Sequence, residues 1–198
     1  MAIRKRMIKA GGLPIIPEEE IASRIQSVKD YCYQLRDQAL VSYMYLTGSR
    51  VEEIVKFMDE TPPSKQIADP IKKNQIVFEG NFMIINNVRC LKRRKRGLRS
   101  IPIPISKEDL FMPFLKNYLD TIKDEDFLFN MTRQRALQIL DEIGMFPHYL
   151  RHLRATYLTT KYGFTHSELK QFFGWTSTAP ADFYVHLNIE NLKEKMLK

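Results

Sequence analysis

The stretch LRDQALVSYMYLTGSRVEEI, residues 35–54, reads as two helices joined by a tight turn. Its apolar first part belongs to a helix that the hydrophobic spacing predicts over about residues 33–46. Gly48 follows that helix, and glycine readily adopts the left-handed conformation that ends many helices. Ser49 can then cap a further helix, RVEEIVKFM, through its hydroxyl. Arg50 is therefore expected in the first turn of a helix, directly after the tight turn.

Helices precede and follow this stretch, and strand-forming segments interrupt them. Pro17 and the three glutamates after it open a helix over about residues 17–28, because proline and acidic residues favour the first turn. Three segments rich in β-branched and aromatic residues, QIVFE, FMIINNVRCL and LRSIPIPI, predict a small antiparallel sheet. Further helices are predicted over about residues 107–122, 133–143, 148–161 and 179–187. The fold class is therefore α+β: mostly helical, with a small antiparallel β-sheet inserted after the first helices.

The composition favours a polyanionic partner. The 198-residue chain has 31 Lys and Arg against 23 Asp and Glu, which gives a formal net charge of +8 at pH 7. Nucleic acid fits this charge better than an anionic membrane surface, because no basic amphipathic membrane helix stands out. No apolar run is long enough to predict a transmembrane helix. Cys32 and Cys90 are the only cysteines, a pattern that favours a reducing, cytoplasmic compartment.

A second stretch, MFPHYLRHLRATYL at residues 145–158, concentrates histidine and arginine on one side of a helix. At about 100° per residue, His148, Arg151 and His152 share one face, and the leucines share the opposite face. A solvated surface would explain this pattern, and so would an anion site, since arginine offers a planar fork to phosphate oxygens. The two histidines at i and i+4 also have the spacing of a zinc pair. Arg151 would place a positive charge beside that zinc, and no cysteine or carboxylate completes the site, so we predict no metal.

The most basic segment lies between two of the predicted strands. Residues 92–99, KRRKRGLR, carry six positive charges in eight positions. A solvated or nuclear-localisation-like run is one interpretation of this segment. Its place between strand-like segments favours a structured hairpin tip that contacts a nucleic-acid backbone. Contacts of this kind position the nucleic acid without reading its sequence.

Three blocks of the sequence together resemble the signatures of the tyrosine recombinases, the family of phage integrases and of Xer- and Cre-like site-specific recombinases. The first block is the opening stretch, the second is HYLRHLRATYL at residues 148–158, and the third is FFGWTSTAPADFYVHL at residues 172–187. A lone T-G-x-R would be a weak match, but three blocks in the family's order and at its separations are specific. The resemblance covers about residues 17–187.

The resemblance implies a set of catalytic residues, carried over position by position. Arg50 and Arg151 correspond to the two arginines that hold the phosphate, and Tyr184 corresponds to the nucleophile. His148 matches the histidine three residues before the second arginine, and Trp175 matches a position that is usually histidine. The implied catalytic set is Arg50, Lys92, His148, Arg151, Trp175 and Tyr184.

Two lysines compete for one member of this set, which the family places on the β-hairpin after the first arginine. The outgoing strand VRCLK favours Lys92, whereas counting back from IPIP leads to residues 94–96 and hence to Lys95. We choose Lys92 as the proton donor and expect Lys95 to contact the DNA backbone. His152 and Glu53 match supporting positions of the family, Glu53 as a partner of the first arginine.

The resemblance further implies an activity and its partners. The expected activity is that of a site-specific recombinase or integrase, which cleaves and rejoins DNA strands through a covalent 3′-phosphotyrosine and needs neither cofactor nor metal. Double-stranded DNA is the expected partner, with a homo-oligomer, a tetramer, on the DNA and no membrane. Such a protein would be prokaryotic or viral and would act on host or mobile-element DNA. A type IB topoisomerase-like relaxation of DNA and a non-catalytic DNA-binding module are the alternatives.

The chain is predicted to contain three segments. Residues 1–16 form a basic N-terminal arm, too short for the helical DNA-clamping domain that family members usually add. Residues 17–187 form the tyrosine recombinase catalytic domain, and residues 188–198 form a C-terminal tail helix that could be exchanged between subunits. The sequence leaves open the target DNA and whether Tyr184 acts in its own subunit or in a neighbour.

Overall fold

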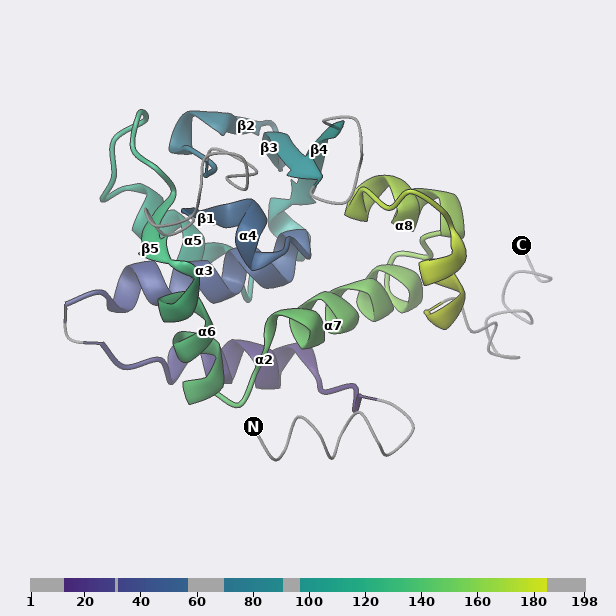
Figure 1. Ribbon diagram of the computed structural model, residues 1–198, viewed down its shortest axis with the longest axis horizontal. Coiled ribbons are helices and arrows are strands. Elements are labelled where there is room, and N and C mark those ends of the chain that lie inside the picture. Colours follow the sequence, from purple (N-terminus) through teal and green to yellow (C-terminus); the bar gives the residue numbers. More distant parts are fainter. Residues whose placement is uncertain (1–12, 31, 57–69, 91–96, 185–198) are drawn as a thin grey trace.

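The computed structural model describes residues 13–30, 32–56, 70–90 and 97–184 of the chain (Figure 1). The helices are α2 (Glu18–Gln26), α3 (Gln34–Thr47), α4 (Val51–Ile54), α5 (Met112–Leu119), α6 (Arg133–Glu142), α7 (Pro147–Thr160) and α8 (His166–Phe173). The strands are β1 (Val55–Lys56), β2 (Ile76–Glu79), β3 (Phe82–Cys90), β4 (Gly97–Pro104) and β5 (Phe129–Thr132). Short 3₁₀ helices are η2 (Lys73–Gln75), η3 (Ile105–Lys107) and η4 (Ala179–Phe183).

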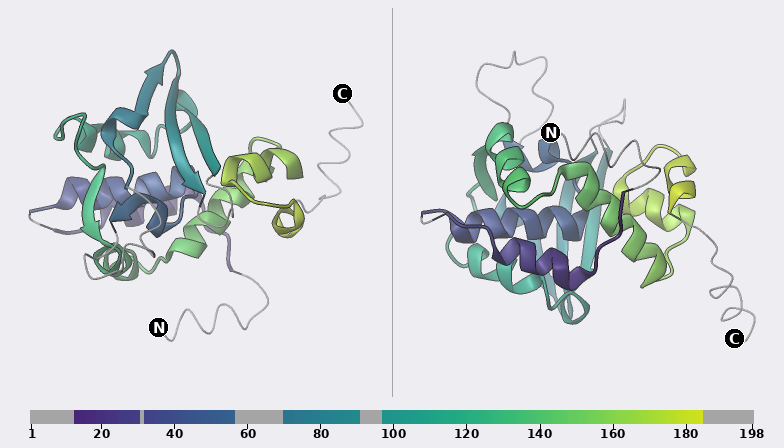
Figure 2. Two further views of the ribbon diagram at one scale, coloured as in Figure 1. Left: turned by 45° about the horizontal axis from the view of Figure 1, so that its top comes forward. Right: turned by 90° about the horizontal axis from the view of Figure 1, so that it is seen from below.

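Helix α3 runs through the middle of the molecule, and four other helices pack around it (Figure 2). Every residue from Asp37 to Thr47 is buried, and α3 contacts α2, α5, α6 and α7. The ring of Tyr43, for example, meets the edge of the Phe129 ring with the centroids 5.7 Å apart. Because α3 is enclosed on all sides, its C-terminal end, which leads to Arg50, is a rigid support for the residues that follow.

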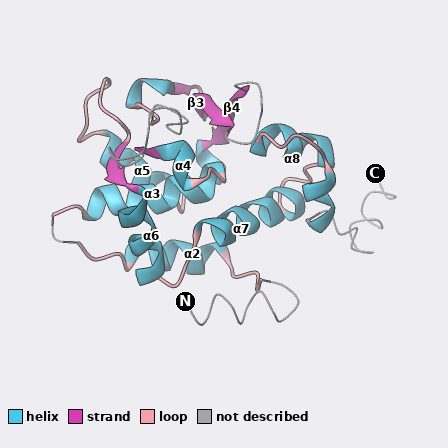
Figure 3. Cartoon of the chain, in the orientation of Figure 1, coloured by secondary structure: helices cyan, strands magenta, loops and turns pink. Residues whose placement is uncertain are grey.

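The predicted antiparallel sheet is present, in the strand order β2–β3–β4 (Figure 3). It contacts α3 through β4 and α4 through β3. Along β4, exposed residues alternate with the buried residues Arg99, Ile101 and Ile103. Since successive side chains of a strand point to opposite faces, Arg99 belongs to the same inward row as the two isoleucines.

A second, parallel sheet pairs β1 with β5, and the sequence analysis did not predict it. RVEEIVKFM was predicted as one helix, but α4 ends at Ile54, and Val55 pairs with Phe129 instead. The β-branched Val55 is buried in this pairing, so a contact with a distant segment overrides the local helical pattern. The predicted cap was also wrong, because Arg50 and not Ser49 is the N-cap residue of α4.

The α+β class is confirmed, and α2, α3, α6 and α7 begin and end close to their predicted bounds. The helix predicted over residues 107–122 is shorter, because α5 begins only at Met112 with a proline in its first turn, where proline is tolerated. The predicted basic tip at residues 92–96 and the predicted tail helix at residues 188–198 lie outside the described residues. Among the helices that are described, none has the length and apolar character needed to cross a membrane.

Candidate active site

The turn after α3 places Arg50 at the start of α4, and this turn requires glycine. Gly48 has a φ of 56°, in the left-handed region, where a side chain is strained. A Cβ at this position would also collide with the ring of Phe173 on α8. Both constraints fix the direction in which the chain leaves α3, and with it the position of Arg50.

Glu53 orients Arg50 from within the same short helix. Arg50 Nη1 donates to Glu53 Oε1 at 3.0 Å, and the backbone N–H of Arg50 donates to Glu53 Oε2 at 3.0 Å. The Glu53 carboxylate is buried, whereas the Arg50 side chain is 27% exposed. The buried Glu53 carboxylate therefore orients the Arg50 guanidinium from the protein interior. Part of the guanidinium remains accessible to a ligand.

Arg151 on α7 is buried, although the sequence pattern placed it on the helix face opposite the leucines. Only 7% of the residue is exposed, because the turn at Gly48 and the end of α8 cover it. Its guanidinium donates to the carbonyl oxygens of Gly48 and Phe173 and lies 4.5 Å from the centroid of the Phe173 ring. Burial, with repulsion from Arg50 and Arg99 in addition, lowers the pKa of Arg151 to about 9. The guanidinium thus stays charged at neutral pH, in surroundings that favour the arrival of an anion.

A row of stacked aromatic rings connects α8 to Tyr184. Trp175 stacks on Phe173 with a centroid distance of 4.8 Å, and on Tyr184 with a centroid distance of 6.1 Å and an interplanar angle of 13°. Gly174, in the left-handed conformation with φ 65°, ends α8 and directs the chain into this row. Only 9% of Trp175 is exposed. The stack therefore fixes the Tyr184 ring relative to α8 and, through Phe173, relative to Arg151.

The Tyr184 phenol is protonated at neutral pH and lies against a histidine. Burial raises the pKa of Tyr184, and the positive charge of Arg151 opposes this effect. The imidazole of His152 lies 5.3 Å from the Tyr184 ring, centroid to centroid. Burial, followed by repulsion from His148, lowers the pKa of His152, so this imidazole is neutral near pH 7. His152, which the resemblance assigned a supporting place, is thus the histidine in ring contact with the phenol.

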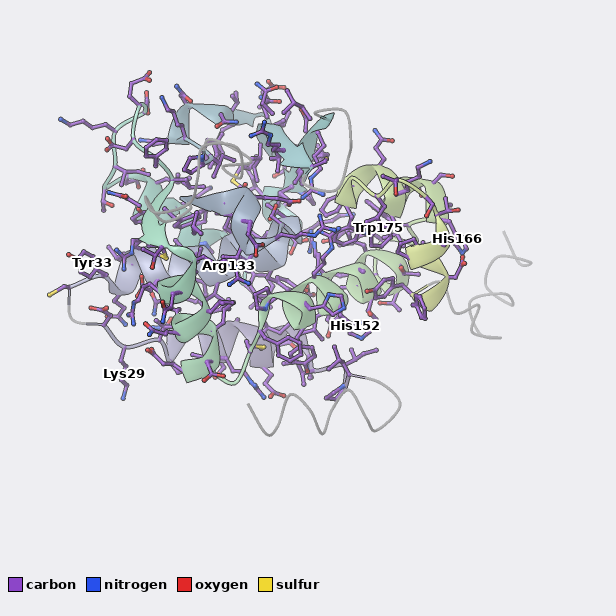
Figure 4. All side chains as sticks on the ribbon, viewed as in Figure 1. Lys29, Tyr33, Arg133, His152, His166 and Trp175 are labelled. Atoms are coloured by element: carbon purple, nitrogen blue, oxygen red, sulfur yellow. The ribbon has the colours of Figure 1, made fainter. Side chains whose placement is uncertain are left out.

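A cavity of about 570 Å³ brings together five of the six residues that the sequence analysis selected. These lining residues are Arg50, His148, Arg151, Trp175 and Tyr184. They come from the start of α4, from α7 and from the segment after α8. Figure 4 shows Trp175 where α8 approaches α7, and His152 on α7 itself. Lys92, the sixth residue, and its alternative Lys95 lie outside the described residues.

Other residues near the cavity were not selected from the sequence. Arg133, at the start of α6, donates through Nε to Glu52 Oε1 at 2.6 Å, and both residues line the cavity. Nothing in the local sequence signals this pair, because only tertiary packing brings α6 beside α4. Arg99 was counted only as part of the basic run, although the alternation of SIPIP after it could have shown that it points inward.

The described start of the chain crosses α7 beside the site. The hydroxyls of Tyr149 and Tyr157 donate to backbone carbonyls of residues 13–16 at 2.7 and 2.9 Å. The backbone of Leu13, in this segment, raises the pKa of His152 and so offsets part of the effect of burial.

The chemistry of the cavity suits a phosphodiester. Arginine forks match phosphate oxygens in shape and charge, and here two of them, from Arg50 and Arg151, border the same space as a tyrosine hydroxyl. The indole N–H of Trp175 can add one further donor. Within the described ranges, no three His, Cys, Asp or Glu side chains gather as a metal site would require.

Both the sequence and the fold are similar to those of known recombinases, although no protein-family model matches the chain. The tyrosine recombinase XerA of Saccharolobus solfataricus is 25% identical over 196 residues, covering 94% of this chain and 59% of that protein. The XerH site-specific recombinase in a post-cleavage complex with palindromic difH substrate has a TM-score of 0.59 at 17% identity, covering 90% of this chain and 50% of that one. The chain is thus similar to tyrosine recombinases in sequence and shares their fold.

The fold also matches that of an isolated catalytic domain. The catalytic domain of bacteriophage HP1 integrase has a TM-score of 0.50 at 17% identity, and the match covers 93% of this chain and 94% of that domain. The chain spans 59% of the length of the curated tyrosine recombinases that it matches first. The predicted resemblance to tyrosine recombinases and the predicted mostly helical fold are confirmed.

Proposed function

We propose that the chain is the catalytic domain of a site-specific DNA recombinase or integrase, which cleaves and rejoins DNA strands through a covalent 3′-phosphotyrosine at Tyr184. The observation that carries this proposal is the single cavity lined by Arg50, His148, Arg151, Trp175 and Tyr184. These residues come from three distant parts of the chain, and packing alone gives no reason for charged, aromatic and nucleophilic groups to meet there. The names of the related proteins support the same activity.

In the proposed cleavage step, the Tyr184 oxygen attacks a DNA phosphorus, and the bond from that phosphorus to the 5′-oxygen breaks. Arg50 and Arg151 hold the non-bridging oxygens, whose negative charge grows in the transition state. Because burial raises the pKa of Tyr184, the phenol needs a base, and we assign this role to His148. Lys92 is assigned to protonate the departing 5′-oxygen.

The rejoining step reverses the first. A 5′-hydroxyl of a partner strand attacks the 3′-phosphotyrosine, a new phosphodiester forms, and the phenol of Tyr184 leaves and recovers its proton. The covalent intermediate conserves the energy of the broken bond, so the exchange requires no nucleotide hydrolysis. Trp175 supports both steps by holding the Tyr184 ring in the stack and by donating its indole N–H to the phosphate.

We propose double-stranded DNA as the partner and a homotetramer on that DNA as the active assembly. The formal charge of +8 supports a polyanionic partner, and the XerH recombinase of similar fold is bound to its palindromic difH substrate. A cytoplasmic location in a prokaryotic or virus-infected cell suits a protein that acts on host or mobile-element DNA. DNA binding through phosphate contacts should weaken steeply with salt, by roughly one unit of log–log slope for each neutralised phosphate.

A library of nicked duplexes tests this proposal without knowledge of the target. The nick lies close to the cleavage point, so that the fragment carrying the 5′-hydroxyl diffuses away and the adduct accumulates. We expect the wild type to form a covalent adduct, whose trapped DNA gives the preferred sequence, and Tyr184→Phe to form none. Tyr33→Phe is the matched control, since Tyr33 is exposed and lies outside the cavity, and this variant should form the adduct normally.

Other outcomes would replace the proposal. If Tyr184→Phe still forms the adduct, the nucleophile is wrongly assigned. If an adduct forms and supercoiled DNA is relaxed without exchange of strands, the activity is that of a type IB topoisomerase. If the protein binds duplex DNA and the wild type forms no adduct with any member of the library, it is a non-catalytic binding module.

A further inference from the structure

Arg99 is a charged residue at an inward position of a strand. It lies on β4 in one row with Ile101 and Ile103, and only 8% of it is exposed. Its partner in the β3–β4 register is Val88, which is also buried. Burying a guanidinium among apolar side chains is costly unless polar partners compensate. The identity of these partners therefore indicates what Arg99 does.

The partners of Arg99 are the residues that surround Arg50. Arg99 Nη2 donates to Glu53 Oε2 at 3.1 Å and to Ser49 Oγ at 3.2 Å. The other Glu53 oxygen, Oε1, accepts from Arg50 Nη1 at 3.0 Å. One buried carboxylate is thus shared between two guanidiniums, one from the start of α4 and one from β4.

Arg99 also reaches the turn that leads to Trp175. A Cβ placed on Gly174, which lines the cavity, would lie 3.4 Å from Cδ and from Nη1 of Arg99. Within the described residues, Nε and Nη1 of Arg99 are buried without a hydrogen-bond partner. An unpaired buried donor destabilises a fold, so a side chain needed only for packing at this position would be better apolar.

We propose that Arg99 is a positioning residue for the anion site: it shares the Glu53 carboxylate, so that Arg50 is oriented without being neutralised. With Glu53 alone, Arg50 would form a neutral ion pair at the cavity. With Arg99 on the second oxygen, the three groups together carry one net positive charge. This inference rests on the proposed function for the identity of the anion, a DNA phosphate.

This extra charge also acts on Arg151. Repulsion from both Arg50 and Arg99 adds to burial in lowering the pKa of Arg151. The positive charges of Arg50, Arg99 and Arg151 therefore repel one another. Among the groups that influence the pKa of Arg151, Glu53 is the one carboxylate that offsets this repulsion. A phosphate that enters the cavity relieves this repulsion, which favours its binding. Removing Arg99 would reduce this favourable contribution to the binding free energy.

Trp175 provides a direct measurement of anion binding. It is the only tryptophan of the chain and lies in the cavity wall, so its fluorescence should respond to an anion there. The full chain is titrated with inorganic sulfate, with ionic strength held constant by chloride. Arg99→Met should weaken sulfate binding on the order of tenfold, because Glu53 then neutralises Arg50 and the net positive charge of the three groups is lost. Arg89→Met, which removes a half-buried charge from the neighbouring strand β3, should change it less than about twofold.

A double-mutant cycle tests whether Arg99 acts through Glu53. In a Glu53→Gln background the shared negative charge is absent, so Arg99→Met should weaken sulfate binding by less than about threefold. Equal losses in both backgrounds would show that Arg99 acts independently of Glu53 and would overturn the proposal. So would a wild type whose Trp175 fluorescence shows no binding of sulfate.

Two further variants separate charge from packing. Arg99→Lys keeps the charge and should retain sulfate affinity within about threefold, whereas Arg99→Gln, which is neutral and polar, should lose about as much as Arg99→Met. If Arg99→Met does not fold, the sulfate affinities of Arg99→Lys and Arg99→Gln are compared instead. Equal affinities for Arg99→Lys, Arg99→Gln and wild type would mean that Arg99 serves packing alone.

The failure of this proposal and that of the proposed function can be told apart. If the wild type forms no DNA adduct but binds sulfate in a way that depends on Arg99 and Glu53, the recombinase activity is refuted and the charge-sharing role stands. If Arg99→Met forms the adduct at the wild-type rate and binds sulfate as the wild type does, only the role of Arg99 is refuted.

Discussion

Arg151 donates a hydrogen bond to the carbonyl oxygen of Gly48, a residue 103 positions earlier in the chain. This contact ties α7 to the turn that positions Arg50. Two guanidiniums of like charge repel each other, so they cannot hold themselves together around an empty site. The backbone turn at Gly48 holds the two arginines together. Its carbonyl oxygen accepts a hydrogen bond from Arg151, and Arg50 follows Gly48 by two residues in the chain.

Replacing Gly48 should therefore damage both the fold and the site. Gly48→Ala places a Cβ against the Phe173 ring and forces alanine into a left-handed conformation with φ 56°. We expect the free energy of unfolding to fall by about 3 kcal/mol, from backbone strain and overpacking together, and sulfate binding to weaken. Urea unfolding and Trp175 fluorescence measure the two effects.

Gly80 supplies the matched control for this substitution. Its φ is also 56°, but no atom lies within 4 Å of a Cβ built there. Gly80→Ala should therefore lose only about 1 kcal/mol, from backbone strain alone. If both alanine variants lose the same free energy of unfolding, the contact with Phe173 does not contribute to the loss at Gly48. In that case α8 does not fix the turn.

The two roles of Trp175, stacking and hydrogen bonding, can be separated by two substitutions. Trp175→Phe keeps a ring between Phe173 and Tyr184 and should leave stability nearly unchanged, while cleavage slows on the order of tenfold because one donor to the phosphate is lost. Trp175→Ala should lose about 3 kcal/mol of unfolding free energy as well. Urea unfolding and the rate of adduct formation give the comparison. A Phe variant that cleaves at the wild-type rate would leave Trp175 with a packing role only.

The sequence allowed the family and most of the helices to be predicted because both leave local marks. Gly48 ends α3 as expected, and three short blocks identified five of the residues that line the cavity. Burial of Arg151 could not be predicted, since the spacing of polar residues on α7 does not reveal that α8 covers that face. The pairing of Val55 with Phe129 and the sharing of Glu53 by Arg99 depend on contacts between segments far apart in the sequence. Such contacts leave no mark in the local pattern.

The two histidines of α7 should differ in their effect on cleavage. We assign His148 as the base, and the ring of His152 lies against the Tyr184 ring. His148→Ala should slow adduct formation by about 10²–10³, the range of general-base catalysis, whereas His152→Ala should slow it less than about tenfold by loosening the phenol. Rates are compared across pH 5–8. If His152→Ala is the more damaging change and alone abolishes the pH dependence, the base is His152.

The choice between the two hairpin lysines can be tested with a modified leaving group. A 5′-thiol leaves without protonation because its pKa lies far below that of an alcohol. Lys92→Ala should therefore cleave the ordinary substrate slowly and the 5′-thio substrate at nearly the wild-type rate. Lys95→Ala should weaken DNA binding with both substrates. If the thio substrate rescues Lys95→Ala and does not rescue Lys92→Ala, the assignment is reversed.

Sulfate binding should weaken as the pH rises through about 9. Burial and repulsion lower the pKa of Arg151 to about 9 in the free site, and only the protonated guanidinium binds an anion, so affinity is full below this pH and falls above it. Sulfate keeps its two charges throughout this range, and burial places the ionisation of Tyr184 higher than its ordinary value. Tyr184→Phe should therefore show the same fall. If the sulfate affinity is constant between pH 7 and pH 10, the surroundings of Arg151 do not lower its pKa into this range.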